Sequence, residues 1–385
     1  MIPLSEPFFS GKEWDYVKSC LDTGWVSSSG PFISQFEKAI AHYVKADYAV
    51  ACVNGTSALH LSLLVAGVLP DDEVLVPTLT FIAPVNAVHY VQAHPVFMDC
   101  DDTYNLDVEK TMLFITQETV FKNGFSYSKK TGRRVSAVIP VHVFGHLVDL
   151  APLISLCQER GIAIIEDASE SLGAYYKQGP LTGLYSGAVG LLGCFSFNGN
   201  KIMTTGGGGM VVTSSQVLAE RLSFLSTQAK TDPLMYQHDE VGYNYRLTNL
   251  QAALGLAQFQ QLPEFIEKKK QHFLKYQAAL SEYSFVKLIQ APDYSASNYW
   301  LFTIQFNRDI SHRKWVSFFK EKGVDSRPIW TLNHLQKPYL HCHSFDISNA
   351  IRLYQSSLNI PSSVGLTDEN LYHVVEVIKE CNHLF

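Results

Sequence analysis

The sequence lacks the features that mark several large classes of protein. Its 385 residues carry a formal net charge of −6. The basic excess that nucleic-acid binding calls for is therefore missing, and no nucleic acid is expected as a partner. No run of about 18 apolar residues occurs, so we expect no membrane span. The N-terminus has no basic segment followed by an apolar stretch, and no signal peptide is expected.

Cysteine pairs and metal-ligand spacings are also missing. The seven cysteines are dispersed, and none belongs to a CxxC motif. An odd, scattered set is typical of reduced thiols, which favours a cytoplasmic location. The segment His341-Cys342-His343 suggests a metal ligand set, but three adjacent residues on a loop rarely all face one ion. We therefore expect no metal.

The glycine motifs of common nucleotide-binding sites do not occur. Neither GxGxxG nor GxxxxGK[ST] is present, which disfavours a dinucleotide or ATP site. A nucleotide-sugar oxidoreductase or epimerase with a Rossmann domain stays only as the alternative from a different class of enzyme.

The composition is that of a folded protein, with 46% hydrophobic and 17% charged residues. Apolar runs of strand length alternate with helical patterns in the first half of the chain. The expected strands are 49–53, 73–76, 95–98, 137–141 and 162–165, and the expected helices are 58–65 and 150–160. Continuous apolar strands separated by helices predict an α/β fold with a mostly parallel sheet.

The length predicts two domains, because a single core stops growing at roughly 250–300 residues. A long helix is expected from Asn249 to about Tyr283, bent or interrupted at Pro263. We expect a large domain over residues 1–248 and a smaller α+β domain over residues 249–385. The turn-rich, basic stretch 116–134 is expected to form an inserted surface hairpin or loop.

Asn54-Gly55-Thr56-Ser57 lies between an expected strand and an expected helix. The start of a helix offers free backbone N–H groups and the positive end of a dipole, which suit phosphate. A helix cap by Thr56 or Ser57 explains the same residues. Taken alone, the segment favours the cap.

Glu166-Asp167 ends an expected buried strand, at the edge where open α/β sheets bind ligands. A carboxylate there could pair with a cationic ring nitrogen. A helix start enriched in acidic residues explains the pattern equally well.

The most specific segment surrounds Lys201. An alternating strand ends in Asn198-Gly199, and Lys201 is followed by four glycines from Gly206 to Gly209. A nucleophilic lysine needs a lowered pKa and a fixed position, and glycines let the backbone approach a ligand closely. A hairpin with an exposed lysine is the simpler alternative. A further polar segment, 242–249, precedes the long helix and by itself is best explained as a connector.

Taken in order, these segments resemble the DegT/DnrJ/StrS family of sugar aminotransferases, which have the aspartate-aminotransferase fold (fold type I). The resemblance covers nearly the whole chain. It is carried by residues 24–31, 77–83, 166–168, 196–201 and 330–335. Several motifs in the right order are far more specific than any one of them.

The resemblance implies a pyridoxal 5'-phosphate (PLP) enzyme in which Lys201 carries the cofactor and Asp167 pairs with its ring nitrogen. The intact pair argues against a non-catalytic regulator of the same fold. The other implied cofactor contacts are Phe81 on the ring, Gly55, Thr56 and Ser196 on the phosphate, and Asn244 on the phosphate of the neighbouring subunit's cofactor in a homodimer. Glu170 stands where family members often have Gln or His, near the ring hydroxyl.

A narrower resemblance comes from residues 196–201, 167–173 and the insertion 116–134. They are similar to the branch that works in bacillosamine and legionaminic acid pathways. This implies transfer from L-glutamate to carbon 4 of a UDP-linked 4-keto-6-deoxy-N-acetylhexosamine, for cell-surface glycan or nonulosonic acid biosynthesis. GDP-perosamine-type enzymes share much of the pattern and stay as an alternative. The residues expected to contact substrate are Trp25, Ser27, Ser29, Arg327 and His334.

Overall fold

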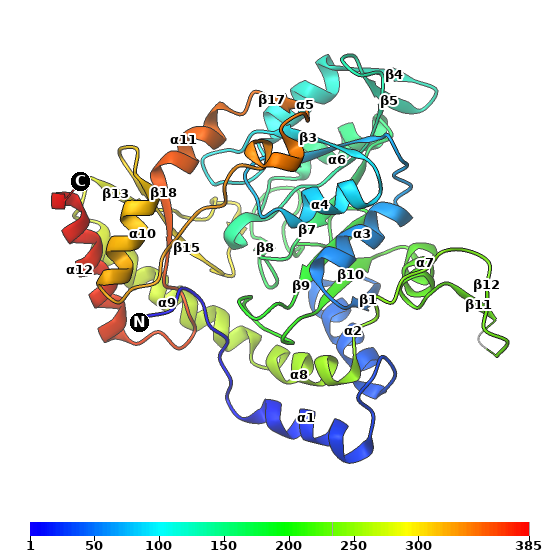
Figure 1. The fold of residues 1–385 in the computed structure, drawn as a ribbon, viewed down its shortest axis with the longest axis horizontal. Helices are drawn as coiled ribbons and strands as arrows, with labels where there is room; N and C mark the ends of the chain where they lie inside the picture. Colours follow the sequence, from blue (N-terminus) through cyan, green and yellow to red (C-terminus); the bar gives the residue numbers. More distant parts are fainter. Residues whose placement is uncertain (233, 385) are drawn as a thin grey trace.

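A computed structural model describes residues 1–232 and 234–384, and its centre is a mostly parallel sheet (Figure 1). Its strands, in spatial order, are β1 (Tyr48–Cys52), β10 (Gly209–Thr213), β9 (Leu192–Ser196), β7 (Ala163–Asp167), β6 (Arg134–Val138), β2 (Glu73–Pro77), β3 (His94–Met98) and β17 (Ser344–Phe345). Strands β9, β7, β6, β2, β3 and β17 are parallel. Strand β10 is antiparallel to both of its neighbours, so β1 runs in the same direction as β9.

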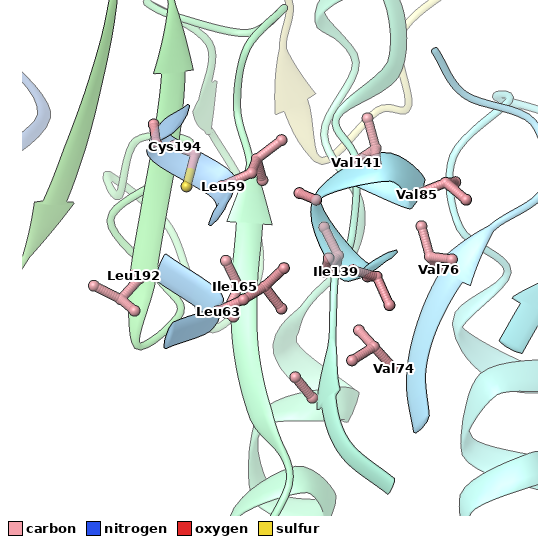
Figure 2. Packing of buried hydrophobic residues seen from close by; sticks show 14 of the residues in the cluster. Leu59, Leu63, Val74, Val76, Val85, Ile139, Val141, Ile165, Leu192 and Cys194 are labelled. Atoms are coloured by element: carbon pink, nitrogen blue, oxygen red, sulfur yellow. The ribbon is translucent and has the colours of Figure 1, made fainter. Parts of the chain in front are cut away.

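The strands are apolar because helices cover both faces of the sheet. On one face lie α3 (Gly55–Val65), α4 (Ala83–Tyr90) and α7 (Gln216–Ser226), and on the other lie α5 (Val108–Gln117) and α6 (Ala151–Glu159). Figure 2 shows Leu63 of α3 beside Ile165 of β7 and Leu59 near Cys194 of β9, all within one buried cluster. Neighbouring residues of β2 enter opposite cores, as the two-residue period of a strand requires.

The predicted strands are confirmed, with bounds that differ by one or two residues for four of them and by three residues for the fifth. The strand expected at 137–141 is β6, and it ends at Val138. Pro140 has no N–H to donate to a ladder, which shortens the regular pairing. The insertion forms the predicted hairpin, made of β4 (Thr119–Lys122) and β5 (Phe125–Ser128), and β5 pairs with β6. Since the hairpin precedes β6, it lies at the amino-terminal edge of the parallel strands.

The predicted long helix is interrupted, as expected. It forms α8 (Asn249–Phe259) and α9 (Leu262–Leu280), with Pro263 in the first turn of α9. Thr248 caps α8 through a capping box with Gln251. Proline is tolerated at the start of a helix, where its missing N–H would have no partner.

The C-terminal part of the chain builds a second, antiparallel sheet. Its strands are β13 (Val286–Leu288), β15 (Phe302–Phe306), β18 (Ser357–Ile360) and β16 (Arg327–Pro328). They pack against α9, α10 (His312–Glu321) and α12 (Asp368–Leu384) in one apolar core. Strand β17, although it belongs to the C-terminal part of the chain, pairs with β3 of the large sheet. The division of the chain into two domains at residue 248/249 stays a prediction.

Further helices and two strand pairs complete the fold. They are α1 (Lys12–Thr23), α2 (Pro31–Val44), α11 (Ser348–Ser356) and the pairs β11 (Lys230–Asp232) with β12 (Gln237–His238) and β8 (Tyr175–Tyr176) with β14 (Ser295–Ala296). Helix α2 packs on the large sheet at β1 and β10. Within residues 1–232 and 234–384, no helix has both the length and the apolar character needed to cross a bilayer.

Candidate active site

A pocket of about 330 Å³ opens beyond the carboxyl ends of the strands that share one direction. In open α/β sheets this edge is where ligands bind, because the chain leaves each strand there. The pocket is lined by the last residues of β7 and β9, by the segments that follow β1, β2, β7 and β9, and by Trp300 and Trp330 from the C-terminal part of the chain. Seven predicted site residues line it, namely Gly55, Thr56, Phe81, Asp167, Glu170, Ser196 and Lys201.

Asp167 is the last residue of β7 and is buried at the floor of the pocket. Its Oδ1 accepts a hydrogen bond from the Ser169 N–H at 3.0 Å. Burial raises the pKa of Asp167, while the hydrogen bonds of Ser169 and the charge of Lys201 oppose the rise. A buried carboxylate in this position stabilises a cationic group beside it.

The neighbouring Glu166 points to the opposite face of the strand and has a structural role that the sequence did not reveal. Its carboxylate accepts hydrogen bonds from the backbone N–H groups of Gly187, Val189 and Gly190. His142 Nε2 lies 2.8 Å from the same carboxylate. The Val148 N–H donates to His142 Nδ1, so the proton of a neutral His142 lies on Nε2 and is donated to Glu166. This network fixes the strand that carries Asp167.

Lys201 follows the turn at the end of β9. Its backbone N–H donates to the Asn198 carbonyl at 3.0 Å. Only 13% of its side chain is exposed, and its Nζ lies 3.7 Å from Glu170 Oε1. Burial lowers the pKa of Lys201, and the negative charges of Glu170 and Asp167 oppose that change. The exposed-hairpin alternative for this lysine is therefore wrong.

The start of α3 corrects one expectation. The helix is capped by Asn54, whose side chain accepts from the Ser57 N–H at 2.8 Å, and not by Thr56 or Ser57. In the described part of the chain, the N–H groups of Gly55 and Thr56 have no acceptor. A Cβ on Gly55 would lie 2.9 Å from Ser196 Cβ, so only glycine fits. The free donors and nearby hydroxyls suit a phosphate group.

The wall after β2 supplies an aromatic ring and an unpaired hydroxyl. Phe81 is 53% exposed although it lines the pocket, so its ring is available to a planar ligand. Thr80 Oγ1 is buried and has no hydrogen-bond partner among the described residues. A buried hydroxyl without a partner costs about 1–3 kcal/mol. A polar ligand in the pocket would remove that cost.

The other predicted residues do not line this pocket. Residues 25–29 are tied to the start of α8, since Asn249 donates to the carbonyls of Trp25 and Ser27. Ser29 is exposed in the same loop. Their role in substrate binding stays a prediction.

Arg327 and His334 lie in the C-terminal part of the chain, in β16 and in a short helical turn. Arg327 pairs with Asp325 at 2.6 Å, and His334 Nδ1 lies 2.8 Å from Thr78 Oγ1. Asn244 forms an isolated bridge with Thr227 and is also absent from the pocket wall. Within one chain, Asn244 therefore does not reach the site of its own subunit.

The profile of the DegT/DnrJ/EryC1/StrS aminotransferase family matches residues 9–379. The chain belongs to this family. It is a PLP-dependent sugar aminotransferase with the type I fold.

Its relatives match over their whole lengths. The GDP-perosamine synthase of Caulobacter vibrioides is 35% identical over 385 residues, covering 98% of each chain. That of Escherichia coli O157:H7 is 35% identical over 380 residues, again covering 98% of both. A solved DegT DnrJ EryC1 StrS aminotransferase from Brucella abortus has a TM-score of 0.86 at 26% identity, covering 96% of this chain and 95% of that one.

The pocket fits the cofactor of this family. Three features of the protein alone support this fit. They are the glycine at position 55, the free N–H groups at the start of α3 and the unpaired Thr80 hydroxyl. When bound, PLP withdraws electrons from the carbon that carries the amino group. Asp167 would hold the charge on the ring nitrogen, and Phe81 would lie on the ring.

Proposed function

We propose that the enzyme transfers an amino group from L-glutamate to carbon 4 of a nucleotide-linked 4-keto-6-deoxy sugar. The observation that carries the proposal is the meeting of Lys201, Asp167 and the free start of α3 around one pocket. An amine, a buried carboxylate and a phosphate-binding helix terminus are the parts that this chemistry requires. Donor and acceptor would use the pocket in turn, with ping-pong kinetics.

Lys201 would serve as the base of the reaction. Its Nζ is close to the pocket and its ammonium form is disfavoured by burial, so the neutral amine is available to remove a proton from the carbon that carries nitrogen. The same proton would then be delivered to the carbon on the other side of that nitrogen. The walls of the pocket keep most of the lysine from water, which limits loss of that proton.

The first candidate substrate is a UDP-linked 4-keto-6-deoxy-N-acetylhexosamine. It is supported by the sequence of residues 196–201, which borders the pocket. The insertion 116–134 gives no geometric support, because its hairpin lies at the edge of the sheet opposite the pocket. Selection of the sugar would therefore depend on residues other than the insertion.

The second candidate is a GDP-linked 4-keto-6-deoxyhexose. It is favoured by the relatives in C. vibrioides and E. coli, both named GDP-perosamine synthase and both 35% identical. The two candidates share the reaction at carbon 4 and differ in the nucleotide and in the acylamino group of the sugar.

A panel of keto-sugar nucleotides separates the candidates. With glutamate as donor, we expect at least a tenfold higher kcat/KM for one of the two 4-keto sugars, corresponding to about 1.4 kcal/mol in the transition state. Product analysis by NMR is expected to place the amine on carbon 4. Preference for a 3-keto sugar would overturn the proposed position of amination, whichever nucleotide is preferred.

A second prediction concerns the lysine that carries the cofactor. Borohydride reduction of the holoenzyme, followed by peptide mapping, is expected to place the cofactor on the peptide that contains Lys201. The reason is that the Lys201 amine is buried beside Asp167 and Glu170. Lys269 is a built-in control, since it is also buried but lies in the C-terminal core. Label on Lys269 would reject the assignment.

The proposed assembly is a homodimer with shared sites. Asn244 lies outside the pocket of its own chain, and the nearby β11–β12 hairpin projects from the body (Figure 1). The large apolar residues Leu234, Met235, Tyr236 and Val241 are 73–87% exposed. Exposed apolar clusters of this kind are typical of protein–protein contacts, and a second copy of the chain would cover them. A cytoplasmic location also stays a prediction.

A further inference from the structure

The amine of Lys201 lies between two side chains from different parts of the fold. Glu170 Oε1 is 3.7 Å from Lys201 Nζ. On another side, Nζ lies 3.8 Å from the centre of the Trp300 ring. Both side chains are buried, with 4% exposure for Glu170 and 3% for Trp300. A carboxylate and the face of an indole each attract an ammonium group.

Hydrogen bonds hold both of these walls in place. The Phe144 N–H donates to Glu170 Oε2 at 2.8 Å, which leaves Oε1 directed at the lysine. The indole N–H of Trp300 donates to the carbonyl of Asn200, the residue before Lys201, at 2.7 Å. Neither side chain can turn away without losing its hydrogen bond, and an unmade hydrogen bond in the protein interior is unfavourable.

Asn298 joins the two walls to each other. Its Nδ2 donates to the backbone carbonyl of Glu170 at 2.9 Å, and its Oδ1 accepts from the backbone N–H of Trp300 at 3.0 Å. A Cβ on Gly145 would lie 2.0 Å from that Oδ1, so glycine is required beside it. Trp300 comes from the C-terminal part of the chain and Glu170 from the loop after β7. The arrangement is thus built by long-range packing.

We propose that Glu170, Trp300 and Asn298 form an amine seat, which holds the free Lys201 amine in one position and stabilises its protonated form. Glu170 and Trp300 contact the amine, and Asn298 is a positioning residue. A glutamine or histidine at position 170, as is frequent in the family, would supply no negative charge, whereas Glu170 supplies one above its pKa, which burial raises to about 7. The inference rests on Lys201 being the lysine that the cofactor uses, as proposed above.

The seat explains how the lysine can act in both directions. Burial alone favours the neutral amine, which removes a proton, whereas the seat favours the ammonium that results. A proton gained by Nζ is held beside Glu170 until it is passed to the reacting carbon. Apart from Glu170, the charge of Asp167 also acts on Lys201, and it is unchanged in the variants below.

The test measures the titration of the Lys201 amine directly. Trace labelling with acetic anhydride over a pH series, followed by peptide mapping, gives the pH at which Lys201 becomes reactive. It is applied to holoenzyme treated with glutamate and to protein stripped of cofactor by hydroxylamine. The stripped protein exposes the amine whatever the donor is, so failure of glutamate to release Lys201 would count against the proposed function and not against the seat.

In both preparations, Glu170→Gln is expected to lower the midpoint of labelling by about one pH unit or more, since an opposite charge nearby raises the pKa of an ammonium group. Trp300→Phe, which keeps an aromatic ring but loses the N–H, is expected to lower the midpoint by about half a unit. Trp330→Phe is the matched control, because Trp330 lines the same pocket but stacks on Phe144. Its midpoint is expected to equal that of the wild type.

The amine seat is rejected if Glu170→Gln and Trp300→Phe both titrate as the wild type does. It is also rejected if the Trp330→Phe control shifts as far as they do, because the effect would then come from loosening of the pocket. Far-UV circular dichroism verifies that each variant is folded. The labelling midpoint of Lys12, an exposed lysine, verifies that the reagent reacts in the same way with every variant.

Discussion

Replacing Asp167 with asparagine is expected to lower kcat by about 100- to 1,000-fold, the range found when one fixed electrostatic partner is removed from an active site. Asp167 is buried at the end of β7 and faces the pocket. Asparagine has nearly the same shape but no charge, so the ring nitrogen of the cofactor loses the group that keeps it protonated. Each unit of lowered pKa on that nitrogen corresponds to about 1.4 kcal/mol.

Three measurements separate lost charge from lost structure in Asp167→Asn. The thermal unfolding temperature and the cofactor content are expected to stay close to those of the wild type, since asparagine can still accept from the Ser169 N–H. Reconstitution with PLP methylated on the ring nitrogen, which is positively charged without a proton, is expected to restore part of kcat. Near-wild-type turnover in the folded variant would show that Asp167 has no such partner.

The sequence predicted the parts of the site that local patterns encode. Asp167 ends one strand and Lys201 follows another, and the apolar character of both strands is visible in the sequence. The carboxyl ends of parallel strands meet at one edge. The predicted cap of α3 was wrong by two to three positions, because asparagine, threonine and serine are all good caps and the four residues 54–57 include one of each. Their order alone does not say which one precedes the first helical turn.

Contacts between distant segments left no signal in the sequence. Trp300 lies 100 positions after Asn200, and the two are joined only when the C-terminal part of the chain packs on the large sheet. The same holds for Glu166, which looked like a candidate acid but accepts hydrogen bonds from Gly187, Val189 and Gly190. A single sequence shows neither contact, because the residues carry no shared local pattern.

The strongest test of assembly uses two variants that are inactive for different reasons. Lys201→Ala removes the residue that would carry the cofactor and is expected to abolish transamination. Asn244→Ala is expected to weaken binding of the cofactor phosphate in the partner's pocket, because Asn244 does not line its own. A two-fold dimer makes such a contact reciprocal, so each subunit would lend Asn244 to the other.

Mixing the two variants is therefore expected to restore activity. In a mixed dimer, one site combines Lys201 from one chain with Asn244 from the other and is intact, whereas the second site has both defects. With free exchange and equal amounts, half of the dimers are mixed, so about a quarter of all sites recover. If Asn244 served its own subunit, every site would have one defect and mixing would restore nothing.

Co-expression of the two chains guarantees exchange, and size-exclusion chromatography with light scattering verifies that dimers are present. A quarter of wild-type activity from two weak parents supports shared sites, and activity no higher than the mean of the parents rejects them.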